Sequence, residues 1–157
     1  MYSKELAKKM KEYLESIKCK YIFDEETGGF EFGYITNRKI GKIYFAITVG
    51  ESAYNIAAYL EDLEVTAENI SAVSEYVHRF NNIIHRCRME FDLECGGVFC
   101  TQMLNCNGVT PCNEMIGECI SEIRFSVKYC DGLIDVIEGI KTPKEVFDEY
   151  EKEILKW

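Results

Sequence analysis

Apolar side chains in the middle of the chain recur at helical spacing and then change to strict alternation. Between Ala67 and about Ile84, apolar residues three or four positions apart lie on one stripe of a helix. They are Ile70, Val73, Val77, Phe80 and Ile84. From Cys87 to Cys95, apolar and charged residues alternate with the period of a strand that has one buried face. We therefore predict a helix that is followed directly by a strand.

The pair Gly96-Gly97 comes after this strand and favours a two-residue hairpin turn, because glycine readily adopts a positive φ. The partner strand then runs antiparallel from Val98 to Leu104. The expected cross-strand pairs are Cys95 with Val98, Leu93 with Cys100, Phe91 with Gln102 and Met89 with Leu104. One face of this hairpin is mostly apolar, so it suits the stripe of the helix.

The contact between the helix and the hairpin is the predicted core. Phe91 and Leu93 of the first hairpin strand should be nearly buried against Val77 and Phe80 of the helix. A sheet with one apolar face has to bury that face against another element, and the amphipathic helix is the nearest candidate.

The N-terminal part of the sequence indicates one helix and then three strands. Ser3 can cap a helix that runs to about Lys18. Strands with alternating or aromatic-rich patterns are expected from Cys19 to Asp24, from Phe30 to Tyr34 and from Lys42 to Val49.

The segment that follows is ambiguous. Apolar residues alternate from Tyr54 to Leu60, which fits a fourth strand. The stretch Ala-Ala-Tyr-Leu-Glu within it also suits a helix, because alanine and leucine are strong helix formers. We predict a strand and keep the helix as the alternative.

The C-terminal third indicates a long helix and then a short one. The long helix should begin at Thr110-Pro111, reach Glu138 with a bend near Gly132, and end in a left-handed cap at Gly139. The segment Thr142-Pro143-Lys144-Glu145 is a capping box that should start the last helix. The expected buried stripe of the last helix is Val146, Phe147, Tyr150 and Ile154.

Together these elements predict an α+β fold in a single domain over residues 1–157. Its antiparallel sheet should have about five to six strands, flanked by the N-terminal helix, the central helix and the long C-terminal helix. A chain of 157 residues is of ordinary length for one domain.

Charge and hydropathy limit the classes of partner. The net charge is −9, which argues against nucleic acid and anionic membranes as partners, because both are bound through basic patches. No apolar run approaches the ~20 residues that cross a bilayer, and the charged N-terminus does not resemble a secretory signal. We therefore expect a cytoplasmic protein.

The sequence contains eight cysteines but no C-x-x-C pair. Most of them stand where an apolar residue belongs: Cys87, Cys95 and Cys100 on the inner hairpin face, and Cys112, Cys119 and Cys130 on the stripe of the long helix. Free cysteine commonly behaves as a small buried hydrophobic residue. We predict reduced core thiols, with disulfides and metal ligands as the alternatives.

Two stretches of the sequence resemble the YbjN domain family. The first is Val77-His78-Arg79-Phe80-Asn81 with the alternating strand, glycine turn and strand that follow. The second is Tyr129-x-x-Gly132-Leu133-x-x-Val136-Ile137-x-Gly139, with Pro143-x-Glu145 after it. The resemblance covers roughly Tyr54 to Asp148. His78 departs from it, because many members carry an asparagine at that position.

This resemblance implies a fold like that of the type III secretion chaperones, which is a curved antiparallel sheet flanked by helices. It also implies a role as a regulator or a chaperone-like binding protein. Its matching residues are core and turn positions, so the resemblance brings no catalytic signature with it.

His78 and Asn81 form the candidate polar site. The amide of Asn81 could satisfy backbone groups of a strand or turn, or it could contact a ligand. His78 and His85 lie two turns apart on one helix face, and Cys87 is a candidate third metal ligand. We expect ordinary surface histidines and a structural asparagine, and we predict no metal, cofactor or catalytic residue.

The outward face of the hairpin is the candidate protein-binding site. Phe99 and Met103 should lie there, opposite Glu90, Asp92 and Glu94. An apolar pair on a wet sheet face is either covered by another element or used for a partner. The three carboxylates, which could in principle serve acid–base chemistry, are expected to form a solvated acidic rim that favours basic partners.

These observations favour a non-enzymatic, chaperone-like or regulatory protein-binding domain, with a protein partner or a homodimer as its assembly. The alternative is a small-molecule-binding or enzymatic domain with a pocket between the sheet and the long helix. A third hypothesis is redox or metal sensing through the cysteines.

Overall fold

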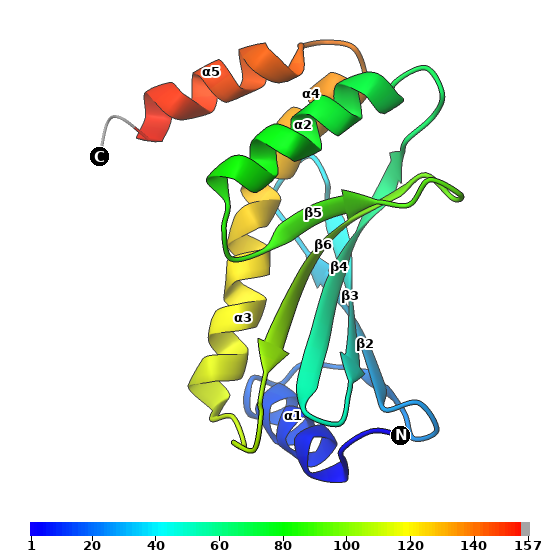
Figure 1. The fold of residues 1–157 in the computed structure, drawn as a ribbon, viewed down its shortest axis with the longest axis vertical. Helices are drawn as coiled ribbons and strands as arrows, with labels where there is room; N and C mark the ends of the chain where they lie inside the picture. The colour runs from blue at the N-terminus through cyan, green and yellow to red at the C-terminus, as the bar shows by residue number, and fades with distance from the viewer. Residues whose placement is uncertain (155–157) are drawn as a thin grey trace.

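The computed structural model describes residues 1–154, and the side chains of residues 1–152 (Figure 1). In chain order the elements are α1 (Lys4–Ser16), β1 (Ile22–Asp24), β2 (Gly29–Ile35), β3 (Lys42–Val49), β4 (Ala53–Glu64), α2 (Ile70–Ile83), β5 (Arg88–Phe91), β6 (Gly97–Asn105), α3 (Asn113–Ser126), the 3₁₀ turn η1 (Val127–Tyr129), α4 (Cys130–Ile137) and α5 (Pro143–Ile154). The predicted α+β fold is confirmed.

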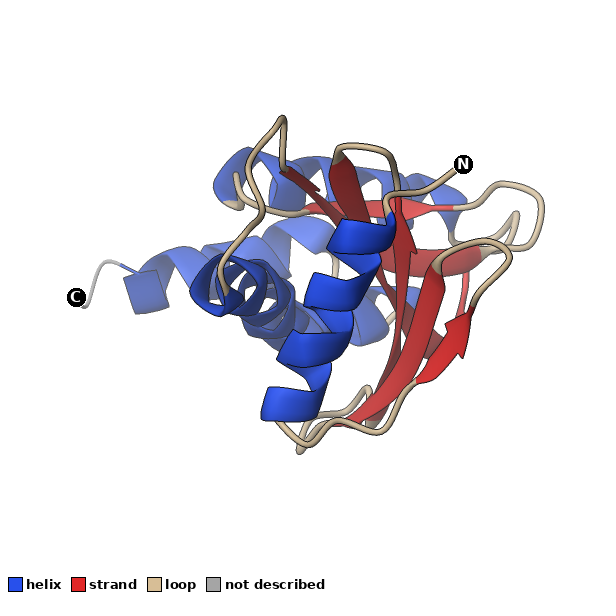
Figure 2. Cartoon of the chain, turned by 90° about the horizontal axis from the view of Figure 1, so that it is seen from below, coloured by secondary structure: helices blue, strands red, loops and turns tan. Residues whose placement is uncertain are grey.

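The strands form one six-stranded antiparallel sheet in the order β1-β2-β3-β4-β6-β5. Burial alternates along its central strands: Ile43, Phe45 and Ile47 of β3 are buried, while Tyr44 between them is exposed. The helices gather on the buried side of the sheet, as the view from below shows (Figure 2). The opposite side, the outer sheet face, carries no helix in the described part of the chain.

The ambiguous segment is a strand, as predicted. β4 pairs with β3 on one side and with β6 on the other, and its residues Tyr54, Ile56 and Ala58 are buried on the helix side. The Tyr54 hydroxyl donates a hydrogen bond of 2.7 Å to the backbone oxygen of Leu6 in α1. Pairing on both edges therefore outweighs the helix propensity of the alanines.

The turn of the β5–β6 hairpin differs from the prediction. The Asp92 N–H donates to the Gly97 oxygen, and the Gly96 N–H donates back to the Asp92 oxygen, so residues 93–96 form the turn. The Asp92 carboxylate accepts a hydrogen bond of 2.7 Å from the Glu94 N–H, which closes the chain into an Asx turn. Gly96 has φ +72°, and a side chain there would meet the Val65 oxygen at 2.6 Å.

The register of the hairpin shifts accordingly. The observed pairs are Arg88 with Thr101, Met89 with Cys100, Glu90 with Phe99, and Phe91 with Val98. Met89 therefore pairs with Cys100 rather than with Leu104, a shift of four positions. Because four is even, each residue that stays in the two strands keeps its predicted face of the sheet.

The predicted core contact is correct in part. Phe80 is fully buried, whereas Val77 and Phe91 are half-buried at the edge of the core. Leu93 is 77% exposed, because it lies in the turn rather than in the strand, so its predicted burial is wrong.

The long C-terminal helix is interrupted. α3 begins at Asn113, later than the predicted Thr110-Pro111, and the turn η1 separates it from α4. The interruption falls at Val127–Tyr129, so the predicted bend at Gly132 is misplaced. Gly139 ends α4 with φ +70°, as expected.

The helix caps predicted at Ser3 and Thr142 are present. The Ser3 hydroxyl accepts a hydrogen bond from the Leu6 N–H at the start of α1. In the capping box of α5, the Thr142 N–H donates to the Glu145 carboxylate at 2.8 Å, and the Glu145 N–H donates to the Thr142 hydroxyl at 3.3 Å. Val146 and Phe147 of α5 are buried. The side chain of Ile154, predicted on the same stripe, lies outside the described side chains.

Within residues 1–154, no helix combines the length and the apolar character that crossing a bilayer requires.

All eight cysteines have free thiols. Cys87, Cys100, Cys119 and Cys130 are buried, as predicted. The prediction is wrong for Cys95, which lies in the exposed turn, and for Cys112, which precedes the first residue of α3 and is exposed. Among the described side chains, no group of three or more histidines, cysteines or carboxylates could hold a metal ion.

This burial pattern predicts a stepwise thiol titration. In the native protein an aromatic disulfide reagent should react rapidly with Cys95 and Cys112 only, and with all eight thiols once the protein is unfolded. Burial raises the pKa of Cys119, and a hydrogen bond with the Cys100 thiol together with burial raises the pKa of Cys87, so the reactive thiolates of both are scarce. Mass spectrometry of the labelled peptides measures the order in which the cysteines react. Early labelling of Cys87 would contradict the observed packing.

Candidate functional site

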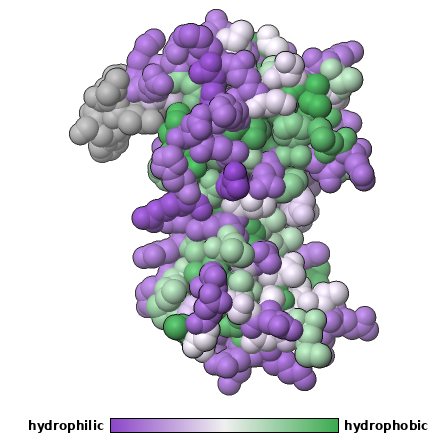
Figure 3. Space-filling model, in the orientation of Figure 1, coloured by the Kyte–Doolittle hydropathy of each residue, from purple (hydrophilic) through white to green (hydrophobic). Residues whose placement is uncertain are grey.

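The outer sheet face exposes large apolar side chains on neighbouring strands. Tyr44 on β3 is 41% exposed, Tyr59 on β4 is 46% exposed and Met103 on β6 is 62% exposed. The ring of Phe99 on β6 lies 5.5 Å from that of Tyr59, centroid to centroid. On the side of the molecule drawn in Figure 3, hydrophobic residues reach the surface in several places between hydrophilic ones.

The structure brings only some of the predicted protein-binding residues together. Phe99 and Met103 lie on the outer sheet face, and Glu90 stands directly across from Phe99. The Glu90 carboxylate accepts a hydrogen bond of 3.2 Å from the hydroxyl of Thr101. Asp92 and Glu94 follow the end of β5, so the acidic rim of three carboxylates does not form along this face.

Asp92 instead stabilises the turn. Backbone N–H groups of Cys95 and Glu94 donate to its carboxylate and hold its pKa below the ordinary value. A carboxylate that accepts these backbone hydrogen bonds stabilises the local conformation of the turn.

A groove of about 560 Å³ lies on the outer sheet face at its β5 end. Its floor comes from β3, β4 and β6, and its wall comes from β5 and the segment before it. The lining includes Ala46, Thr48, Asn55, Ala57, Tyr59, His85, Arg86, Arg88, Thr101 and Met103. No carboxylate lines this groove. His85, Arg86 and Arg88 form the basic wall of this groove. The sequence pattern does not predict this wall, because Arg86 and Arg88 are far along the chain from the residues of the floor.

A second hollow, of about 620 Å³, lies between α3 and the segment that joins α2 to β5. Ile83, Ile84 and the exposed ring of Phe125 give it a largely apolar wall. Glu118 and Glu122 also line this hollow, and Glu122 accepts hydrogen bonds from Arg86 and, at 2.7 Å, from the side-chain amide of Gln102. Its lining residues come from the end of α2, from α3 and from the segment before β5, whereas the predicted pocket lies between the sheet and the long helix.

Asn81 makes two backbone hydrogen bonds at the edge of the sheet. Its side-chain N–H donates to the Met89 oxygen at 3.0 Å, and its side-chain oxygen accepts from the Met89 N–H at 2.9 Å. The amide therefore fastens the end of α2 to β5, which is the structural role considered from the sequence. The Nε2 atom of His78 lies 3.3 Å from the Asn82 amide on the exposed face of α2. His78 and Asn81 do not converge on a common site.

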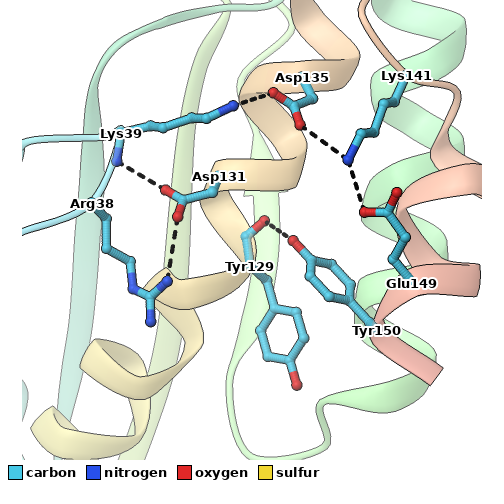
Figure 4. Close-up of polar contacts among 8 residues, drawn as sticks. All are labelled: Arg38, Lys39, Tyr129, Asp131, Asp135, Lys141, Glu149 and Tyr150. Atoms are coloured by element: carbon cyan, nitrogen blue, oxygen red, sulfur yellow. Dashed lines mark hydrogen bonds and ion pairs between the residues drawn. The ribbon is translucent and has the colours of Figure 1, made fainter. Parts of the chain in front are cut away.

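An ion-pair network joins the β2–β3 turn to α4 and α5 (Figure 4). The Asp131 carboxylate accepts from the Lys39 N–H at 3.0 Å and from Arg38 at 3.3 Å. Asp135, which is buried, pairs with the ammonium groups of Lys39 and Lys141. Because cations already neutralise both carboxylates, we interpret the network as a structural anchor between distant segments.

Beside this network, two tyrosines share one backbone acceptor. The hydroxyl of Tyr150 donates to the backbone oxygen of Tyr129 at 3.4 Å (Figure 4). The hydroxyl of Tyr76 donates to the same oxygen. Tyr76 is fully buried, and burial raises its pKa far above the ordinary value of 10.

This raised pKa predicts a loss of stability in alkali. The stabilising effect is complete below pH 10 and declines as the pH rises, because the phenol ionises in the unfolded chain but not in the folded one. Above pH 10 we expect this residue to lower the free energy of unfolding by about 1.4 kcal/mol per pH unit. Urea denaturation between about pH 8 and 11 should show a shallower decline in Tyr76→Phe. Tyr59→Phe, at an exposed position, is the control, and equal slopes in all three proteins would contradict the prediction.

Comparison with known proteins finds a likeness in fold. No family model matches this sequence, and no curated protein matches it. Among solved structures, YbjN from E. coli, described as a candidate transcription regulator, superposes with a TM-score of 0.59. The match covers 77% of this chain and 87% of that chain, with 8% sequence identity. The chain therefore has a YbjN-like fold, as the resemblance predicted.

Proposed function

We propose that this chain is a non-enzymatic, chaperone-like or regulatory protein-binding domain. It contacts its partner, a client protein or a second copy of itself, through the outer sheet face. The observation that carries the proposal is the one-sided architecture. The helices pack on the inner face, while Tyr44, Tyr59, Phe99 and Met103 face outward on three adjacent strands.

The chemistry of these side chains supports a protein partner. Aromatic residues and methionine are enriched in protein interfaces, because each removes a large apolar area from water on contact. The regulator role ascribed to YbjN is compatible with such a domain, since regulators act by binding. Eight free thiols suit the reducing cytoplasm, which is where we place its function.

A double variant tests this proposal. Phe99→Thr with Met103→Thr should keep the fold, because threonine favours strands and both positions face outward. We expect it to lose self-association in sedimentation, or to lose partners in a pull-down from native cytosol. Ile140→Thr, at a position that is 61% exposed between α4 and α5, is the matched control. Unchanged mass and unchanged partners in the double variant would contradict the proposal.

The hollow beside α3 supports a second candidate function, the binding of an apolar small molecule. Its volume of about 620 Å³ lies within the ordinary range of ligand pockets. Saturable binding of a fluorescent apolar probe that is lost in Phe125→Ser would favour this function. Binding that Phe125→Ser leaves unchanged would argue against it.

A further inference from the structure

The groove on the outer sheet face is lined by cationic and not by anionic side chains, although the whole chain is acidic. The chain carries 27 acidic against 18 basic residues. The groove is lined by His85, Arg86 and Arg88 and by no carboxylate. A local reversal of charge on an acidic protein attracts anionic groups to that place and repels them elsewhere.

The two arginines differ in whether they already have a partner within the chain. Arg86 already pairs with Glu122. The Arg88 guanidinium makes no hydrogen bond or ion pair within the described residues, and it stands across from Thr101 on the outward side of β5. Glu90, the next outward residue of that strand, is hydrogen-bonded to Thr101. Arg88 is therefore available for a bidentate contact with a carboxylate from outside.

The floor of the groove adds apolar and hydrogen-bonding surface. Ala46 and Ala57 pair across β3 and β4, and their small side chains leave the space hollow. Tyr59 and Met103 supply apolar area beside them. An extended peptide presents alternate side chains in the same direction, so neighbouring groups of one segment can reach both the arginine and this floor.

We infer that this groove docks an acidic, extended segment of a protein partner, with a carboxylate on Arg88 and apolar side chains against Tyr59 and Met103. The inference rests on the proposed function and specifies the chemistry of the partner. It reverses the sequence-based expectation of basic partners, because Asp92 and Glu94 do not line the face and the arginines do.

Fluorescence anisotropy with two synthetic peptides tests the inference. The first peptide has about ten residues in the repeat Glu-Ser-Val-Ser, so that glutamate and valine point in the same direction in an extended chain, and the second has lysine in place of each glutamate. The acidic peptide should bind more tightly, and added salt should weaken its binding. Equal binding, or tighter binding of the basic peptide, would overturn the inference. So would a single-stranded oligonucleotide that binds more tightly than the acidic peptide.

Variants of the full chain locate the contact. Arg88→Gln should weaken binding of the acidic peptide about tenfold, as expected for the loss of a charge-assisted hydrogen bond, and Arg88→Lys should recover part of it. Lys8→Gln makes the same change in net charge on the exposed side of α1 and should leave binding unchanged. Circular dichroism establishes that each variant is folded. Equal effects of Arg88→Gln and Lys8→Gln would overturn the inference.

The outcomes also separate this inference from the proposed function. If peptide binding does not depend on Arg88 while the Phe99 and Met103 double variant still loses its partner, the outer sheet face binds protein but the acidic specificity is wrong. If the double variant keeps all its partners, the proposed function fails independently of the peptide results.

Discussion

Phe80→Ala should lower the free energy of unfolding by about 3–5 kcal/mol, whereas Leu93→Ala should change it by less than about 0.5 kcal/mol. Phe80 is fully buried in α2, and its ring packs edge-to-face with that of Tyr129 at a centroid distance of 5.7 Å. Leu93 is 77% exposed in the β5–β6 turn. Urea denaturation followed by circular dichroism measures both variants.

This pair of variants also decides the register of the hairpin. A two-residue turn at Gly96-Gly97 would place Leu93 on the inner face across from Cys100, where truncation of a buried leucine costs about 2–5 kcal/mol. In the observed register Cys100 lies across from Met89 instead. A large loss of stability in Leu93→Ala would contradict the observed turn, and a small loss in Phe80→Ala would contradict the observed core.

Gly132→Ala should lower the free energy of unfolding by about 1–3 kcal/mol, the usual effect of overpacking. Gly132 lies in α4, where a methyl group would overlap the side chains of Val146 and Tyr150 from α5. Alanine is better than glycine in a helix by about 1 kcal/mol. The steric overlap therefore has to cost more than this gain in helix propensity, because α5 has to move away from α4 to make room for the methyl group.

Gly117→Ala is the matched control, because Gly117 also lies within a helix. The added methyl would meet the ring of Tyr13 at 3.4 Å, which is an ordinary contact. We therefore expect this variant to gain up to about 1 kcal/mol from helix propensity. Thermal and urea denaturation should show effects of opposite sign. If both variants are stabilised, the close packing of α5 on Gly132 is wrong.

Local patterns in the sequence were sufficient for most elements. Alternation from Lys42 to Val49 predicts β3 with its observed bounds, and the capping box at Thr142 predicts the start of α5. Signals of this kind succeed because a strand's alternation and a helix cap depend on residues within a few positions of each other. The start of α3 was misplaced because the Thr110-Pro111 signal is compatible with a helix but does not require one.

Local signals of this kind do not predict the register of the hairpin. Both turns are locally plausible, and the shift of four positions leaves each residue that stays in a strand on the same face, so the alternation within the strands does not distinguish them. The observed turn is selected by its fit to the rest of the fold, where the Val65 N–H donates to the Gly96 oxygen at 2.8 Å.

Periodicity in the sequence is sufficient to predict most of the secondary elements, the fold class and the outward position of Phe99 and Met103, because it sets which face a side chain occupies. Which charged groups meet depends on how the elements pack in three dimensions. The Lys39 N–H and Asp131 are 92 positions apart, and the basic wall at Arg88 faces a floor formed by β3, β4 and β6. A sequence pattern does not give the distances in space between residues that are far apart along the chain, because strand order and the packing of α4 set these distances.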